Sequence, residues 1–347
     1  MNLKVETEAG SQSQDKAKTH WSNLEERGVY LGLKIMLMTY RVLGRAGFSV
    51  LLYPVISYFF LAGTTARRAS IDYLSRIHSD AKGRSVLTRR PGWPQSFWHF
   101  ICFGEAALDK LLAWTGKIRL EDVDFVNHEA FDSLQETGRG GVLIASHLGN
   151  AEVCRALGMR RQGMKFNVLV HTKHARNFNR LMASVSPDST VSLIQTTEVG
   201  PETAMLLRQK VDAGEFVVIV GDRTPASEAP RASWAPFLGE PAPFPQGPFI
   251  LAALLKCPVL LIFCLKENGR FRVIFEPFCD ALDMPRSRRR EILDELIARY
   301  AKRLEFHCLN HPYQWFNLFD FWKQAERVYP GNARTRPLGA SAEMQRR

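Results

Sequence analysis

The chain lacks the motifs of several common enzyme classes. Its 347 residues contain neither a GxSxG nucleophile motif nor a GxxxxGK[ST] phosphate-binding loop. The segment GRGG at 138–141 has no third glycine of a dinucleotide-binding fingerprint, and it precedes an apolar run instead of following one. These absences argue against a serine hydrolase with a nucleophile elbow, a P-loop nucleotide hydrolase and a Rossmann dehydrogenase.

Cysteine is scarce, and no two cysteines form a CxxC pair. Most of the six lie in apolar runs such as LLKCPVLLIFCL at 254–265, which predicts buried free thiols in a reducing compartment. His307 and His311 are four residues apart, but the glutamate of an HExxH zinc motif is missing between them. A surface or packed histidine pair is therefore expected, and neither a metal nor another cofactor is predicted.

Acidic residues are few. The chain has 35 Asp and Glu against 46 Lys and Arg, which gives a formal charge of +11. Such a balance favours a negative partner, which could be nucleic acid, an anionic membrane surface or an acidic protein. Because no helix-turn-helix, zinc-finger or RNA-binding signature accompanies the charge, a nucleic-acid partner is not expected.

Long uncharged runs are also rare, and the clearest covers residues 46–65. Its 20 residues are long enough to cross a bilayer as a helix, and Pro54 near its centre is tolerated there. Paired arginines flank both ends: Arg41, Arg45, Arg67 and Arg68. We expect membrane contact, either as a full span or as a dip into one leaflet; the alternative is a buried helical hairpin in a soluble protein.

The remaining chain predicts an α/β fold. Residues 66–132 have a helical pattern, whereas apolar strands alternate with helices from Gly138 onward, and residues 223–245 are expected to form a loop. We predict a mixed, largely parallel sheet flanked by helices. The expected parts are a mobile N-terminus (1–20), membrane-associating helices (21–65), an α/β domain (66–330) and a mobile basic tail (331–347).

A candidate reaction centre lies in SHLGNAE at 146–152. His147 ends a predicted strand, where α/β proteins bind ligands, and Asn150 is a good N-cap for the helix that follows. Glu152 would then lie in the first helical turn, where the helix dipole keeps a carboxylate ionised. Such a carboxylate can orient an imidazole that takes a proton from a substrate. The alternative is a capping interaction without catalytic purpose.

A second strand end carries polar groups. VVIVGDRTP at 217–225 ends a predicted strand at Asp222 and Arg223, in the same position relative to the sheet as His147. A glycine- and proline-rich segment and an apolar helix follow. This arrangement supports the prediction that His147 belongs to a functional site.

These segments resemble a known family. SHLGNAE is similar to the HxxxxD/E signature of the lysophospholipid acyltransferase superfamily, and FLGEPAPFPQGPFILA at 237–252 resembles the branch of late acyltransferases of lipid A biosynthesis. The N-terminal segments at 20–45 and 51–74 resemble the predicted acyltransferases encoded in aryl-polyene lipid clusters. Together the resemblance covers roughly residues 20–330. The EGTR box of glycerol-phosphate acyltransferases is absent, which disfavours a glycerol-phosphate acceptor.

The resemblance implies transfer of a fatty acyl chain to a hydroxyl or amine of a lipid or glycolipid. The donor would be an acyl thioester, with acyl carrier protein favoured over coenzyme A, and the enzyme would act on the cytoplasmic side of a bacterial inner membrane. It further implies that His147 is the general base and Glu152 its acidic partner. Expected substrate or oxyanion contacts are Asn150, Arg180, Asp222 and Arg223. A non-enzymatic protein that binds anionic lipid or nucleic acid, or a lipid hydrolase with the same His–Glu pair, are the alternatives.

Overall fold

The structure is a computed structural model that divides into two compact units, residues 1–55 and 56–347. It describes residues 36, 38–80, 86, 87, 89–151, 153, 154, 165–170, 191–195, 200–224 and 231–322. The first unit holds most of an apolar helix, Met38–Ala62, which is long and apolar enough to cross a membrane. Pro54 lies inside this helix without interrupting it.

The last turns of the apolar helix belong to the second unit and have two kinds of side chain. Ile56 and Phe60 are buried, and Phe60 makes edge-to-face contacts with Phe97 and Phe100. In contrast, Tyr58, Phe59 and Leu61 are exposed, and Tyr58 is 68% exposed. One side of the helix end is therefore part of the core, while the other presents apolar side chains to the surroundings.

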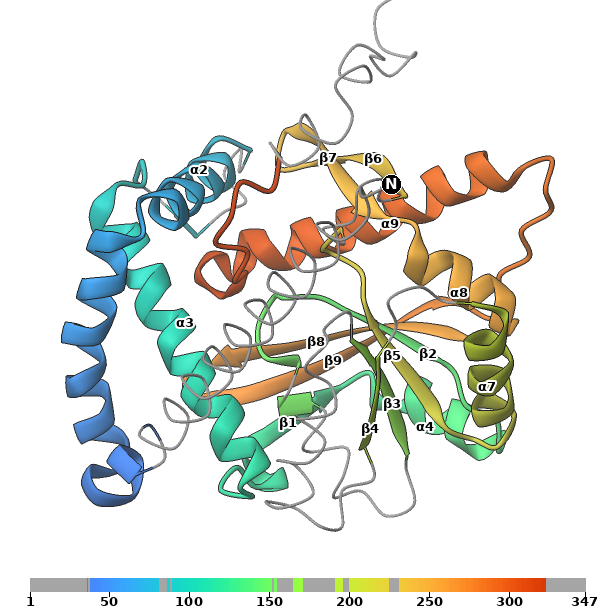
Figure 1. Ribbon diagram of the computed structural model, residues 1–347, viewed down its shortest axis with the longest axis horizontal. Helices are drawn as coiled ribbons and strands as arrows, with labels where there is room; N and C mark the ends of the chain where they lie inside the picture. Colours follow the sequence, from blue (N-terminus) through green and yellow to red (C-terminus); the bar gives the residue numbers. More distant parts are fainter. Residues whose placement is uncertain are drawn as a thin grey trace, which may run out of the picture. The chain divides into compact units, whose positions relative to one another are not determined.

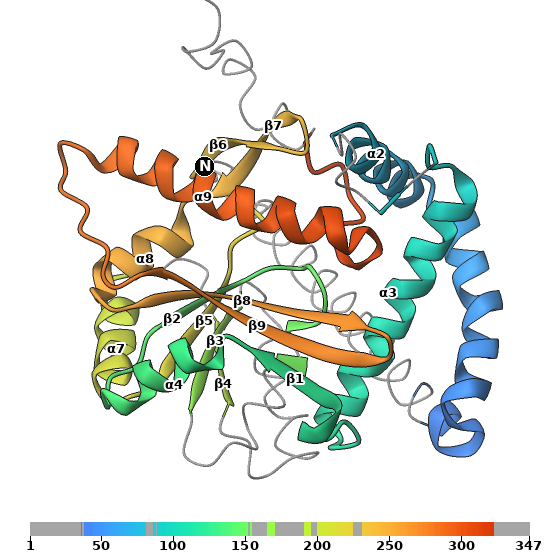
Figure 2. The same cartoon turned by 180° about the vertical axis from the view of Figure 1, so that it is seen from behind.

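The second unit is built on a seven-stranded sheet in the order β1-β9-β8-β2-β5-β3-β4 (Figures 1 and 2). Among the described strands of this sheet, β8 and β9 pair antiparallel and the other neighbours pair parallel. The strands are β1 (Val123–Val126), β2 (Val142–Ala145), β3 (Phe166–Val170), β4 (Val191–Gln195), β5 (Phe216–Val220), β8 (Val259–Glu267) and β9 (Arg270–Cys279). The predicted mixed, largely parallel α/β fold is confirmed.

Helices cover both faces of this sheet. Helix α9 runs along one face and α4 lies on the other (Figures 1 and 2). The helices are α2 (Thr64–Asp80), α3 (Trp93–Trp114), α4 (His128–Glu136), α7 (Pro201–Asp212), α8 (Gly247–Leu255) and α9 (Arg289–Asn310), with the 3₁₀ turns η1 (Leu120–Asp122) and η2 (Pro312–Gln314). Pro201 occupies the first turn of α7, where its missing N–H costs no hydrogen bond.

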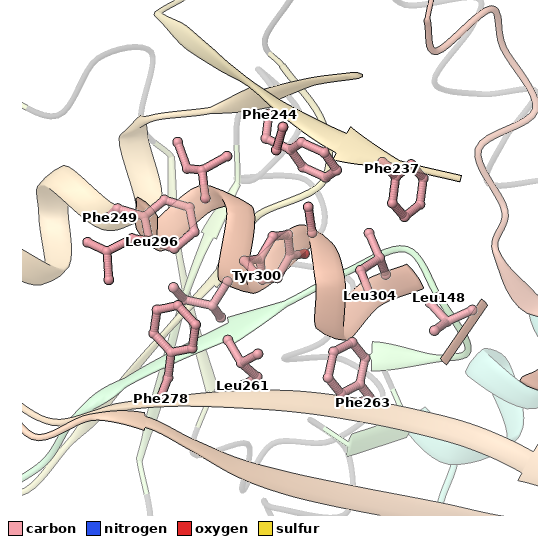
Figure 3. Packing of buried hydrophobic residues seen from close by; sticks show 14 of the residues in the cluster. Leu148, Phe237, Phe244, Phe249, Leu261, Phe263, Phe278, Leu296, Tyr300 and Leu304 are labelled. Atoms are coloured by element: carbon pink, nitrogen blue, oxygen red, sulfur yellow. The ribbon is translucent and has the colours of Figure 1, made fainter. Parts of the chain in front are cut away.

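The core between the sheet and α9 is centred on Tyr300 (Figure 3). Its ring is fully buried against Phe244 and Phe249, and its hydroxyl donates to the carbonyl of Ala145 at 3.1 Å. Ala145 is the last residue of β2. The core therefore fixes the strand end from which the candidate site begins.

Two elements differ from the sequence prediction. Strand β1 lies within the segment predicted to be helical, and the expected loop at 223–245 contains an antiparallel hairpin of β6 (Ala232–Phe237) and β7 (Glu240–Pro245). Three prolines in β7 and one in β6 conceal the strand pattern, since proline cannot donate to a sheet ladder. The hairpin tolerates them because it has two strands only, and buried Phe237 and Phe244 anchor it.

Candidate active site

The register of two parallel strands brings His147 and Asp222 together. Ala145 at the end of β2 is paired with Val220 at the end of β5, and the N–H of Gly221 donates to the carbonyl of Ala145 at 2.9 Å. His147 and Asp222 each follow their strand end by two residues. The carboxyl ends of parallel strands thus place both side chains at the same edge of the sheet.

The imidazole and the carboxylate are directly hydrogen-bonded. Nδ1 of His147 lies 2.8 Å from Oδ1 of Asp222, and the backbone N–H of His147 donates to Oδ2 at 2.9 Å. The Asp222 side chain is fully buried, whereas that of His147 is 32% exposed. Because an ionised carboxylate only accepts, the contact assigns a proton to Nδ1, so that in the neutral imidazole Nε2 is the nitrogen with a free lone pair.

Asp222 is held in its charged form despite its burial. Burial by itself would raise its pKa, but the charge and hydrogen bonds of His147 and the indole of Trp315 hold the pKa below its ordinary value. The Trp315 Nε1–H donates to Oδ2 at 2.9 Å, and Asn317 Nδ2 approaches the same oxygen at 3.4 Å. A fixed negative charge therefore lies behind the imidazole.

The segment after α9 also fastens the loop that carries His147. Leu148 forms an antiparallel bridge with Trp315, and the N–H of Phe316 donates to the carbonyl of His147 at 3.0 Å. On the other side of this loop Gly149 has a φ of +72°, and a Cβ there would lie 1.9 Å from the carbonyl oxygen of Cys264. Only glycine permits this approach.

A buried hydrogen-bond chain supports Trp315 from α3. His99 Nε2 lies 3.0 Å from the carbonyl oxygen of Trp315, and Nδ1 lies 3.0 Å from the hydroxyl of Ser70. Ser96 in turn donates to Ser70 at 2.9 Å. Burial lowers the pKa of His99 to about 4, although its bond to the Trp315 carbonyl acts in the opposite direction. His99 is therefore neutral, with its Nε2–H donating to Trp315.

The other predicted site residues are distributed differently. Glu152 and Arg180 lie outside the described residues. The amide of Asn150 donates to the carbonyl of Ala106 at 2.8 Å. Arg223 donates from Nε to Asn317 Oδ1 and from Nη2 to the carbonyl of Phe316 at 2.9 Å. Arg223 is thus attached to the segment that holds Asp222.

Sequence reasoning missed Trp315 and Asn317 as members of this site. The aromatic-rich sequence HPYQWFNLFDFW at 311–322 predicts that this segment packs onto the domain, and Trp315, Phe321 and Trp322 are indeed buried in the core. The feature of the sequence that could have indicated these residues is the presence of two amide side chains, Gln314 and Asn317, within an aromatic run. Polar side chains in such a run need hydrogen-bond partners when they are buried, but the sequence does not identify these partners.

The histidine pair and the cysteines have structural surroundings. His307 Nε2 contacts Glu276 at 2.8 Å, and His311 Nε2 contacts Glu267 at 2.9 Å. Within the described ranges, no group of three or more metal-ligating side chains is present. All six cysteines are free thiols, with Cys257, Cys264 and Cys308 buried and the other three partly buried.

A comparison with protein-family models identifies the chain. The model for bacterial lipid A biosynthesis acyltransferases matches residues 108–324, which is more than half of the chain. The chain belongs to this family. The matched region includes His147, Asp222 and Trp315, and it begins after the apolar helix.

Membership of the lipid A acyltransferase family gives the site a chemical class. It implies a lipid acyltransferase with a place in lipid biosynthesis. No curated protein matches the chain. The apolar helix is one candidate membrane anchor, in keeping with a family of membrane-associated acyltransferases.

Proposed function

We propose that this protein transfers a fatty acyl chain from an acyl thioester to a hydroxyl or amine of a lipid or glycolipid. The observation that carries the proposal is the His147–Asp222 contact at 2.8 Å, in which Nδ1 faces the carboxylate. Nε2 of His147 has no partner among the described residues. It is the nitrogen available to accept a proton from the acceptor.

In the proposed reaction, His147 acts as the general base. The acceptor hydroxyl or amine transfers a proton to Nε2 while its oxygen or nitrogen attacks the thioester carbonyl. Buried Asp222 stabilises the imidazolium that forms, as in other carboxylate–histidine pairs. Collapse of the tetrahedral intermediate breaks the carbon–sulfur bond, and His147 returns the proton to the thiol that leaves.

The oxyanion of the tetrahedral intermediate needs donors. We assign this role to backbone amides or to a cation, with Arg223 and Arg180 as candidates. Two of the Arg223 nitrogens already bind Asn317 and Phe316, so this residue would contribute through Nη1. Removal of one such donor costs about 10²–10³ in rate in well-studied enzymes.

Glu152 remains a candidate acidic partner in this proposal. The family signature HxxxxD/E matches His147 and Glu152, whereas Asp222 supplies the carboxylate that Nδ1 contacts. Both carboxylates can contribute if Asp222 fixes the tautomer and Glu152 acts on the substrate side of the imidazole. Asn150 is proposed as a substrate contact.

Acyl carrier protein is the proposed donor, favoured over coenzyme A because it is strongly acidic and this chain carries a charge of +11. The proposed location is the cytoplasmic side of a bacterial inner membrane, with the helix Met38–Ala62 as a peripheral or spanning anchor. The N-terminal resemblance to acyltransferases of aryl-polyene clusters supports a relationship to that branch.

Incubation of membranes containing the protein with radiolabelled acyl carrier protein tests the proposal. Label in lipid supports acyl transfer. Release of free fatty acid would instead indicate a hydrolase, and no turnover with carrier or coenzyme A thioesters would favour a non-enzymatic lipid-binding protein. The His147→Ala variant is the matched control for background activity.

A further inference from the structure

A cavity of about 230 Å³ lies beside the loop that carries His147. Its walls come from α3, from Gly149 and Asn150 after β2, from the β8–β9 hairpin and from the segment after α9. Phe316 lines the cavity, and its N–H binds the carbonyl of His147. The cavity and the imidazole therefore share one loop at the carboxyl end of β2, where α/β proteins bind ligands.

The charged residues of this wall leave an excess negative charge. Glu105 and Asp109 lie one helical turn apart on α3, and Lys266 faces them from β8. Lys266 forms an ion pair with Asp109 at 2.6 Å, and the Asp109 side chain is 2% exposed. Glu105 has no hydrogen bond or ion pair within the described part of the chain. Among the described residues, its charge therefore has no partner.

The uncharged polar groups of the wall also favour a hydrogen-bond donor as ligand. The amide nitrogen of Asn150 donates a hydrogen bond to the carbonyl of Ala106. The amide oxygen Oδ1 has no partner among the described residues. Both ends of the Gln314 amide bind the backbone of Lys266. Within the described part of the chain, the unpaired groups are therefore the Glu105 carboxylate and the Asn150 carbonyl oxygen, and both are acceptors.

We infer that this cavity binds a primary ammonium group of the acyl acceptor. Glu105 provides the counter-charge and Asn150 Oδ1 accepts a second hydrogen bond. The inference rests on the proposed function, because it assigns the cavity to the acceptor of that reaction. An anionic group such as a phosphate is disfavoured, since two carboxylates face a single lysine. A lipid head group and a free amine share the required chemistry.

Cys102 provides a reporter inside the cavity. Burial, followed by the charge of Glu105, raises the pKa of its thiol to about 12, while Lys266 lowers it. We would label the full-length protein with a trimethylammonium-ethyl and a sulfonatoethyl methanethiosulfonate. For each reagent, the rate of modification of Cys102 is measured by peptide mass spectrometry. It is then divided by the rate of the same reagent with free cysteine. Both reagents react with the same thiolate, so the thiolate fraction cancels in the ratio of the two rates. The ratio therefore reports the sign of the electrostatic potential at Cys102.

The wild-type protein should prefer the cationic reagent by about tenfold. Glu105→Gln should bring the ratio close to one, while Glu136→Gln, at an exposed position of α4, should leave it unchanged. Ethanolammonium should slow the labelling of Cys102 in the wild type but not in Glu105→Gln, and ethylene glycol should slow neither. A ratio near one in the wild type, an unchanged ratio in Glu105→Gln, or a Cys102 that neither reagent reaches would overturn the assignment.

A separate assay distinguishes this inference from the proposed function. Lysophosphatidylethanolamine and its N-acetyl derivative are compared as acceptors, and Glu105→Gln should raise the KM for the first with little change in kcat. Equal transfer to both acceptors by the wild type would refute the role in acceptor binding. If neither lipid nor any other acceptor is acylated while the labelling ratios hold, the proposed function fails and the cation-binding cavity stands.

Discussion

The indole of Trp315 donates a hydrogen bond to Asp222 at 2.9 Å and joins two residues that are 93 positions apart. With the two contacts from His147 and the amide of Asn317, Asp222 is approached by four donors. A buried carboxylate with so many donors stays ionised and cannot rotate away from the imidazole. The segment after α9 is therefore part of the candidate active site.

Trp315→Phe should lower kcat by about tenfold, because it removes one hydrogen bond to a buried charge. Phenylalanine keeps an aromatic ring at this buried position, so the fold should persist with some loss of stability. Trp322→Phe is the matched control, since the Trp322 indole nitrogen is buried without a hydrogen-bond partner among the described residues. Steady-state acyl transfer measures both variants, and equal losses would show that Trp315 acts only through packing.

His147→Ala should reduce acyl transfer by about 10²–10⁴-fold with the fold intact, because it removes the general base. Asp222→Asn should lose up to about 10⁴-fold, since an amide stabilises neither the Nδ1–H tautomer nor the imidazolium. Glu152→Gln should be slower than the wild type yet retain more activity than His147→Ala. Activity of His147→Ala within a few-fold of the wild type would exclude the proposed mechanism.

Paired Phe59→Lys and Leu61→Lys substitutions should weaken binding to zwitterionic liposomes in a flotation assay, where the added charge gains no attraction. These side chains are 58% and 60% exposed at the end of the apolar helix, and lysine there costs apolar contact with lipid. Met205→Lys, at a position on α7 that is 67% exposed, is the control.

A deletion that removes the apolar helix should end at Val55 and not at residue 65. Buried Phe60 belongs to the core of the second unit, so its loss would also destabilise that unit.

Charge reversal at the start of α9 tests the donor. Arg288 pairs with Glu291, and Arg303 binds Glu276, but Arg289 and Arg290 are exposed. Arg289→Glu with Arg290→Glu should therefore raise the KM for acyl carrier protein and flatten its salt dependence, because exposed charges steer an acidic partner.

The same double variant should leave turnover with a small thioester unchanged. Reversal of Arg89 and Arg90, two adjacent exposed arginines before α3, serves as the control. Equal losses with both donors would assign Arg289 and Arg290 to the fold or to membrane contact. Preference of the wild type for coenzyme A thioesters would refute the carrier protein as donor.

His99 should make stability fall as the pH drops from about 6.5 to about 4. Its pKa is lowered to about 4 in the folded state, so the unfolded chain binds a proton in this range that the folded chain does not. The contribution is about 3 kcal/mol. Thermal unfolding across this range should show a flatter pH dependence for His99→Gln. His128→Gln, at a half-exposed histidine of α4, is the comparison variant.

Hydrophobic patterning alone predicts much of the second unit. Apolar runs specify β2, β5 and β8, because buried parallel strands need side chains that are apolar on both faces. Pro201 predicts the start of α7. The same patterns place His147 and Asp222 just beyond strand ends, so local sequence determines which edge of the sheet carries the chemistry.

Only the tertiary structure decides which side chains meet at that edge. The strand order makes β2 and β5 neighbours, and their register sets Asp222 against His147. Trp315 reaches Asp222 because α9 packs on the sheet through Tyr300, and the proline-rich hairpin β6–β7 is stabilised by the same core. The periodicity of apolar residues indicates which faces of each segment are buried. Contacts between distant segments depend instead on how the whole core packs.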